Sequence, residues 1–195
     1  MLRRATLAAI LALAPIAIAS AQTADTIEKA WSALAGDGVV LIVRHAIAPG
    51  SSDPPGFRLE DCATQRNLSA EGRAQAERLG AVLRSRGVRI TKVMSSPWCR
   101  TIDTARLMGF IDIEVNDALW NLVHNPPDRD EKVARARSLI RNWRGPGVLM
   151  LLTHGSTAQA VTGASYTREG GSLVVQPDPE APLGMRVVGP LPPPD

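Results

Sequence analysis

The chain has 195 residues, with 22 Lys and Arg against 19 Asp and Glu, and a formal net charge of +3. Because 45% of the residues are hydrophobic, the chain can build a core, which argues against intrinsic disorder. The small charge and the lack of a basic stripe argue against a nucleic-acid partner. Two cysteines exclude a cysteine-rich zinc site. Only three histidines are present, at positions 45, 124 and 154, so their placement is informative.

The first 21 residues are typical of a secretory signal peptide. Arg3 and Arg4 precede an almost wholly apolar run over residues 6–18, and Ala19-Ser20-Ala21 is a small-residue cleavage motif. An apolar run of about 15 residues is shorter than the roughly 20 needed to span a bilayer, which weighs against an uncleaved membrane anchor. We therefore expect cleavage near Gln22, secretion into the periplasm, and no stable membrane insertion of the mature chain.

Residues 22–195 are predicted to form one domain in which strands and helices alternate. Apolar residues at helical spacing predict helices over 23–35, 69–86 and 98–108, and one around 133–143. Short apolar runs predict strands over 38–43, 90–94, 111–115, 148–152, 172–175 and 185–188. Residues 45–68 lack a clear period and are expected to form a long loop. Seven of the 15 prolines lie in residues 177–195, which indicates an irregular C-terminal end.

The alternation predicts a three-layer α/β/α fold with a mostly parallel central sheet. In such sheets, ligands bind beyond the carboxyl ends of the strands. Three predicted strands end at unusual residues, namely Arg44-His45, Ser95-Ser96-Pro97 before Cys99-Arg100, and Thr153-His154-Gly155-Ser156. A single histidine at a strand end, or a single arginine in the first turn of a helix, can be explained by a purely structural or solvated side chain. Their recurrence at equivalent strand ends indicates a phosphate site, because guanidinium groups hold phosphate oxygens and an imidazole can attack phosphorus.

These segments resemble the signatures of the histidine phosphatase superfamily, whose members have the phosphoglycerate-mutase-like fold. Leu41–Ala46 is similar to the family's Arg-His-Gly signature, Ser95–Thr101 with Thr104-Ala105 to the second signature, and Leu151–Gly155 to the third. Arg66–Ser69, with Gly72 and Ala76, resembles a segment found between the first two. The resemblance covers roughly residues 38–162. Because only 53 residues separate Arg100 from His154, it implies a member with a minimal cap.

The resemblance implies a metal-independent phosphatase (a phosphoric monoester hydrolase) without a cofactor. His45 would be the nucleophile and would carry a phosphohistidine, while Arg44, Arg100 and His154 would form the phosphate pocket. Further candidate substrate contacts are Ser51, Gly155 and Ser156. We expect a phosphorylated small molecule or an envelope phosphosugar as substrate.

The proton donor for the leaving group is unassigned. Asn121 stands where one branch of the family has a glutamate, and Gly155 follows the last histidine where another branch has an aspartate. The remaining acid candidates are Glu60, Asp61 and Asp53 in the long loop, and Asp128 after it. Two other functions therefore stay open: a non-catalytic phosphate- or phosphosugar-binding module, and a phosphohistidine-protein phosphatase, whose good leaving group needs no acid. His124 is expected to be a surface histidine, with a contact to substrate as the alternative.

Cys62 and Cys99 form an even pair in a chain expected to reach an oxidising compartment. We predict a disulfide between them, with two unrelated thiols as the alternative. The bond would tie the long loop to the residue next to Arg100.

Overall fold

A six-stranded sheet lies at the centre of the computed structural model, which describes residues 14–165 and 168–194. The strand order is β3-β2-β4-β1-β5-β6. The strands are β1 (Val39–Arg44), β2 (Ile90–Ser95), β3 (Glu114–Val115), β4 (Val148–Thr153), β5 (Ser172–Pro177) and β6 (Met185–Leu191). The first four strands pair in parallel, and β5 and β6 extend the sheet antiparallel at one edge. The predicted mostly parallel α/β sheet is confirmed.

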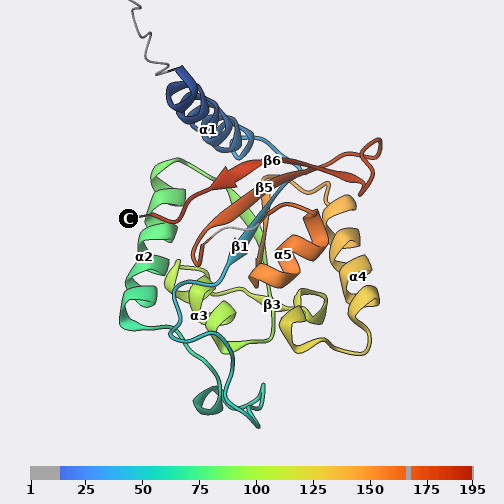
Figure 1. Ribbon diagram of the computed structural model, residues 1–195. Coiled ribbons are helices and arrows are strands. Elements are labelled where there is room, and N and C mark those ends of the chain that lie inside the picture. Colours follow the sequence, from blue (N-terminus) through green and yellow to red (C-terminus); the bar gives the residue numbers. More distant parts are fainter. Residues whose placement is uncertain (1–13, 166–167, 195) are drawn as a thin grey trace, which may run out of the picture.

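Helices cover both faces of this sheet. The described residues form the helices α1 (Ala14–Ala33), α2 (Ala70–Ser85), α3 (Cys99–Leu107), α4 (Arg129–Arg141) and α5 (Gly155–Thr162), with the short 3-10 turns η1 (Cys62–Thr64), η2 (Asp117–Leu119) and η3 (Leu122–His124). Figure 1 shows α2 and α3 on one side of the sheet, and α4 and α5 on the other. Alternate residues of β1 enter two separate cores, Leu41 on the α2 side and Ile42 on the α5 side. This alternation produces the three layers.

Several element boundaries differ from those predicted, and three of the differences bear on the predicted cleavage site, the sheet edge and the C-terminal end. Helix α1 ends close to its predicted end but begins at Ala14, so it crosses the predicted cleavage site. The strand predicted over 111–115 shrinks to Glu114–Val115, and Ile111 is 96% exposed, so it does not add to the buried core. Strand β6 continues through Pro190, which corrects the expectation of an irregular end for this stretch. A proline fits there because β6 is an edge strand.

The part of α1 that enters the core follows the predicted cleavage site. Ala30 and Leu34 are buried, and Ile27 and Trp31 pack against the same core. Helix α1 packs on β6. Within the described residues, no helix has both the length and the apolar character required to cross a membrane.

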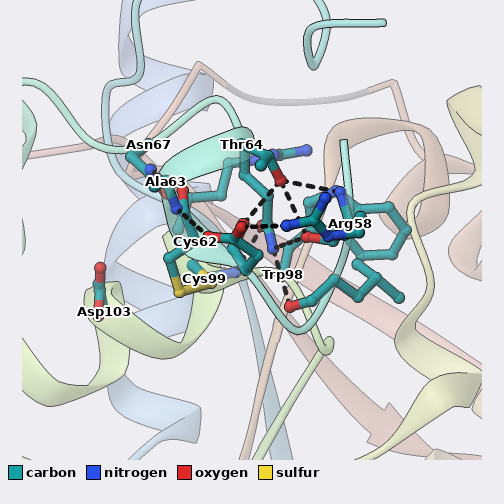
Figure 2. Close-up of a disulfide and its surroundings, with 12 residues drawn as sticks. Arg58, Cys62, Ala63, Thr64, Asn67, Trp98, Cys99 and Asp103 are labelled. Atoms are coloured by element: carbon teal, nitrogen blue, oxygen red, sulfur yellow. Dashed lines mark hydrogen bonds and ion pairs between the residues drawn. A yellow bond between two sulfur atoms is a disulfide. The ribbon is translucent and has the colours of Figure 1, made fainter. Parts of the chain in front are cut away.

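The predicted disulfide is present. Cys62 in η1 is bonded to Cys99, the first residue of α3, with a Cα–Cα distance of 5.7 Å. Figure 2 shows this bond together with the polar contacts of the loop around it. The side chain of Asn67 donates to the Cys62 carbonyl at 2.5 Å, and the Cys99 N–H donates to Gln65 Oε1 at 3.0 Å. The long loop is therefore fixed to the start of α3.

Removing this disulfide is expected to lower the free energy of unfolding by about 4 kcal/mol. The reason is that the unfolded chain has more conformational entropy without the crosslink than with it. The measurement is urea unfolding of wild type and of the double variant Cys62→Ser/Cys99→Ser. A thiol reductant should bring the wild-type midpoint to that of the double variant and leave the double variant unchanged. Equal midpoints without reductant would contradict the prediction.

Candidate active site

The site lies where β1, β4 and β2 end side by side. Arg44 is in register with Thr153, and Leu152 with Ser95. The residues that follow these three positions therefore emerge at one edge of the sheet. Sheet hydrogen bonding continues to the first of them, because the His45 N–H donates to the Thr153 carbonyl at 3.1 Å.

His45 is arranged as a neutral imidazole with one free nitrogen. Its Nδ1 lies 2.8 Å from the Ala46 carbonyl oxygen, which only accepts, so the proton is assigned to Nδ1. Nε2 is then an acceptor and faces Arg66 Nη2 at 3.4 Å. Burial, with the nearby Arg100 as the next cause, lowers the pKa of His45 to about 3. The ring therefore stays unprotonated, as a nucleophile must.

His154 lies beside His45 at the end of β4. The two ring centroids are 5.4 Å apart, and His154 is almost fully buried. Its Nε2 lies 2.8 Å from Ser96 Oγ, whereas its buried Nδ1 has no hydrogen-bond partner among the described residues. Burial, reinforced by His45 and Arg100, holds the pKa of His154 well below its usual range. Both imidazoles are thus neutral.

Three arginines surround this pair. Arg44 and Arg100 come from the predicted strand ends, whereas Arg66 comes from the long loop and was missed as a site residue. Arg66 Nη1 donates to the carbonyls of Ala48 and Gly50, at 3.0 and 2.6 Å. The sequence did carry a signal for it, since Arg66 begins the segment that resembles a family motif.

Glu169 is a second residue that the sequence did not indicate. One carboxylate oxygen lies 3.4 Å from Arg44 Nη2 and 3.3 Å from Arg66 Nη2. The other oxygen accepts from the Ala48 N–H at 3.4 Å. No spacing or motif marks Glu169, because it reaches the site only through the fold.

Asp53 holds Arg100 in place. Its carboxylate accepts from Arg100 Nη1 and Nη2, at 2.7 and 3.2 Å, and both side chains are 1% exposed. The Arg66 N–H at 2.9 Å and Trp98 Nε1 at 3.1 Å also donate to it. Burial alone would raise the pKa of Asp53, but the hydrogen bonds from Arg100 and Arg66 lower it to about 2. An ionised carboxylate is a poor proton donor.

The other acid candidates lie away from the site. Glu60 and Asp61 both pair with Arg58, at 3.7 and 2.5 Å, and Asp128 pairs with Lys132 at 3.0 Å. These three carboxyl groups do not line the cavity in front of the histidines.

That cavity has a volume of about 390 Å³. Of the predicted residues, it is lined by Arg44, His45, Ser51, Asp53, Arg100, His154, Gly155 and Ser156. The additional lining residues are Ser52, Arg66, Asn121, Val123, His124 and Gln159. Within residues 14–165 and 168–194, no group of three or more His, Cys, Asp or Glu side chains is placed to hold a metal ion.

Acid is expected to destabilise the fold through the two neutral histidines. An unfolded histidine binds a proton below about pH 6.5, whereas folded His45 binds one only near pH 3. The contribution of the two histidines to the free energy of unfolding is then fully present above about pH 6.5. It falls as the pH decreases, by up to ~1.4 kcal/mol per pH unit for each histidine. Urea unfolding between pH 7.5 and 5 measures this slope. A variant His45→Gln should show a smaller slope, and an unchanged slope would contradict the assignment.

Comparisons with known proteins agree with this geometry. A family model described as the histidine phosphatase superfamily (branch 1) matches residues 40–122, which contain Arg44, His45 and Arg100. A search of curated proteins finds no match.

Solved structures share the fold. The protein histidine phosphatase SixA complexed with tungstate is 20% identical, with a TM-score of 0.58 over 80% of this chain and 97% of that chain. A putative phosphohistidine phosphatase SixA from Agrobacterium tumefaciens is 24% identical, with a TM-score of 0.56 over 80% and 99%. The mycobacterial glucosyl-3-phosphoglycerate phosphatase complexed with VO3 is 16% identical, with a TM-score of 0.54 over 76% and 96%. The chain therefore matches the histidine phosphatase superfamily model over residues 40–122 and shares its fold with these phosphatases.

Proposed function

We propose that this chain is a secreted phosphatase that hydrolyses a phosphomonoester through a phosphohistidine on His45. The observation that carries the proposal is the state of His45. Its Nδ1 is fixed by a carbonyl, and its unprotonated Nε2 faces an arginine at a cavity wall. A module that only binds phosphate has no need for a nucleophile held in this way.

The surrounding groups suit the phosphoryl group. Buried nitrogens without a hydrogen-bond partner in the described part of the chain, His154 Nδ1 and Arg100 Nε, are available to hold its oxygens. The guanidinium groups of Arg44, Arg66 and Arg100 supply positive charge where negative charge accumulates in the transition state. We propose that these groups perform the electrostatic work without a metal ion.

The cavity rim supports a substrate rich in hydroxyl groups. Beyond the arginines, it presents the hydroxyl groups of Ser51, Ser52 and Ser156 and the amides of Asn121 and Gln159. Such side chains both donate and accept hydrogen bonds, as sugar hydroxyls do. A phosphosugar of the cell envelope is therefore our proposed substrate class.

Secretion is supported by two independent features. The N-terminal residues are typical of a signal peptide, and the Cys62–Cys99 disulfide is of a kind that persists in oxidising compartments. N-terminal sequencing of the protein from a periplasmic fraction is expected to begin near Gln22. Recovery of the chain with Met1 retained would contradict secretion with cleavage.

The enzymatic proposal is tested by trapping the intermediate. Brief incubation with substrate, followed by denaturation, should leave one phosphoryl group on His45, labile to acid and stable to alkali. Phosphate binding without turnover would favour the binding module. Turnover of a phosphohistidine protein, with no activity on sugar phosphates, would favour the phosphohistidine-protein phosphatase.

A further inference from the structure

The phosphatase reaction needs a proton source that the strand-end residues do not supply. An alkoxide such as that of a sugar leaves poorly unless it is protonated as the phosphorus–oxygen bond breaks. His45 and His154 are neutral, Asp53 is ionised, and the lining arginines do not release their protons. Asn121 lines the cavity but has no dissociable proton.

His124 is the remaining titratable side chain among the described residues that line the cavity. It lies in the turn η3, and its side chain is 26% exposed, so solvent can reach it. Imidazole exchanges protons near neutral pH, where the other lining groups do not change charge.

Contacts with Trp98, Phe57 and Asp53 fix the His124 ring. The ring stacks on Trp98 with a centroid distance of 5.5 Å and an angle of 15°, and Phe57 lies 4.9 Å away. Its Nε2 lies 3.1 Å from Asp53 Oδ2. The carboxylate only accepts, so Nε2 is the donor in this pair. Its other nitrogen, Nδ1, is then the atom that can exchange a proton with a substrate.

Charged groups of both signs lie around the His124 ring. Asp53 is the anion in direct contact, although it is shared with Arg100. From α4, Arg129 Nη1 donates to the Leu122 carbonyl in the same turn, at 2.9 Å. A bound phosphomonoester adds negative charge to a cavity that already contains three arginines. Asp53 thus orients His124 through Nε2, much as a buried aspartate orients the histidine of a catalytic triad.

We propose that His124, oriented by Asp53, is the general acid that protonates the leaving group; this inference rests on the proposed phosphatase function. His45 Nε2 forms a bond to phosphorus, the bond from phosphorus to the leaving oxygen breaks, and that oxygen takes a proton from His124. Water then attacks the phosphohistidine and the phosphorus–nitrogen bond breaks, so that dihydrogen phosphate leaves with both protons of the water and His45 is neutral again. His124 regains its proton from solvent before the next turnover.

The test compares leaving groups in wild type and His124→Gln. Glutamine places an amide nitrogen near the position of Nε2, which can still donate to Asp53, but it has no proton to transfer. Turnover of an alkyl phosphate, sn-glycerol 3-phosphate, is expected to fall by about 10²–10⁴-fold. Turnover of p-nitrophenyl phosphate should stay within about threefold, since p-nitrophenolate leaves without protonation.

The pH profile provides a second measurement. A reaction that depends on a general acid slows at alkaline pH, so wild-type turnover of sn-glycerol 3-phosphate should decrease there, and this decrease should be missing from His124→Gln. The matched control is Asn125→Gly, which changes an exposed neighbour of His124 that does not line the cavity and should leave the ratio of the two substrates unchanged.

Equal losses for both substrates, or no loss for either, would overturn the role of His124. If the variant is unstable, addition of imidazole to His124→Gly should restore sn-glycerol 3-phosphate turnover selectively, and failure of this rescue would also count against the proposal. A failure of the phosphatase function itself looks different. In that case wild type hydrolyses neither substrate, and both proposals are overturned.

Discussion

Replacing His45 with alanine is expected to abolish phosphatase activity, with a loss of at least about 10⁴-fold for every substrate. The loss is independent of the leaving group, because His45 Nε2 forms the bond to phosphorus and no other neutral imidazole is positioned to replace it. The ring centroids of His45 and His154 are 5.4 Å apart, but His154 Nε2 is hydrogen-bonded to Ser96 Oγ. The measurement is steady-state turnover of p-nitrophenyl phosphate together with trapping of the phosphoenzyme.

The pattern across variants separates the roles of the two histidines. His45→Ala should form no phosphoenzyme, whereas His124→Gln should still form it from p-nitrophenyl phosphate. Folding of both variants is verified by thermal unfolding. Wild-type turnover in His45→Ala, or a phosphoenzyme on another residue, would remove His45 from the mechanism.

Replacing Asp53 with alanine is expected to lower the free energy of unfolding by about 3–5 kcal/mol, as is typical when one partner of a buried ion pair is removed. Arg100 would be left buried without its counterion, and Trp98 Nε1, the Arg66 N–H and His124 would lose an acceptor. Activity should decrease with every substrate, since both Arg100 and His124 lose their positioning contact.

Urea unfolding and turnover of p-nitrophenyl phosphate measure these two effects. Asp61→Ala is the matched control, since Asp61 lies in the same loop and pairs with the exposed Arg58. Its loss should change stability by less than about 1 kcal/mol. Asp53→Asn keeps the shape of the side chain and should be less harmful than alanine. If Asp53→Ala and Asp61→Ala have equal effects, the structural account of Asp53 is wrong.

Much of the fold and half of the site follow from local patterns. The apolar runs of β1 and β4 and the helical spacing of α2 predict their elements closely, because strand and helix periodicities are properties of neighbouring residues. Parallel strands bring their carboxyl ends to one edge, so His45 and His154 could be placed together without coordinates. The disulfide was also predicted, because two cysteines allow only one intramolecular pairing.

The rest of the site depends on the path of residues 45–68, which have no periodicity. This loop carries Asp53 and Arg66, and it is held by the disulfide and by side-chain bonds between residues far apart in sequence. Asp53 meets Arg100 across 47 positions and His124 across 71, distances over which local patterns contain no information.

The sequence by itself therefore determined the layered sheet and the placement of His45 beside His154, because these depend on periodicity and on strand ends. Only the tertiary structure decided the partners of Asp53 and the position of the third histidine. It pairs Asp53 with Arg100, which lowers the pKa of Asp53 to about 2, and it brings His124 from its expected surface position to the cavity wall. The physical reason is that charge states depend on burial and on partners, and both are set by the fold.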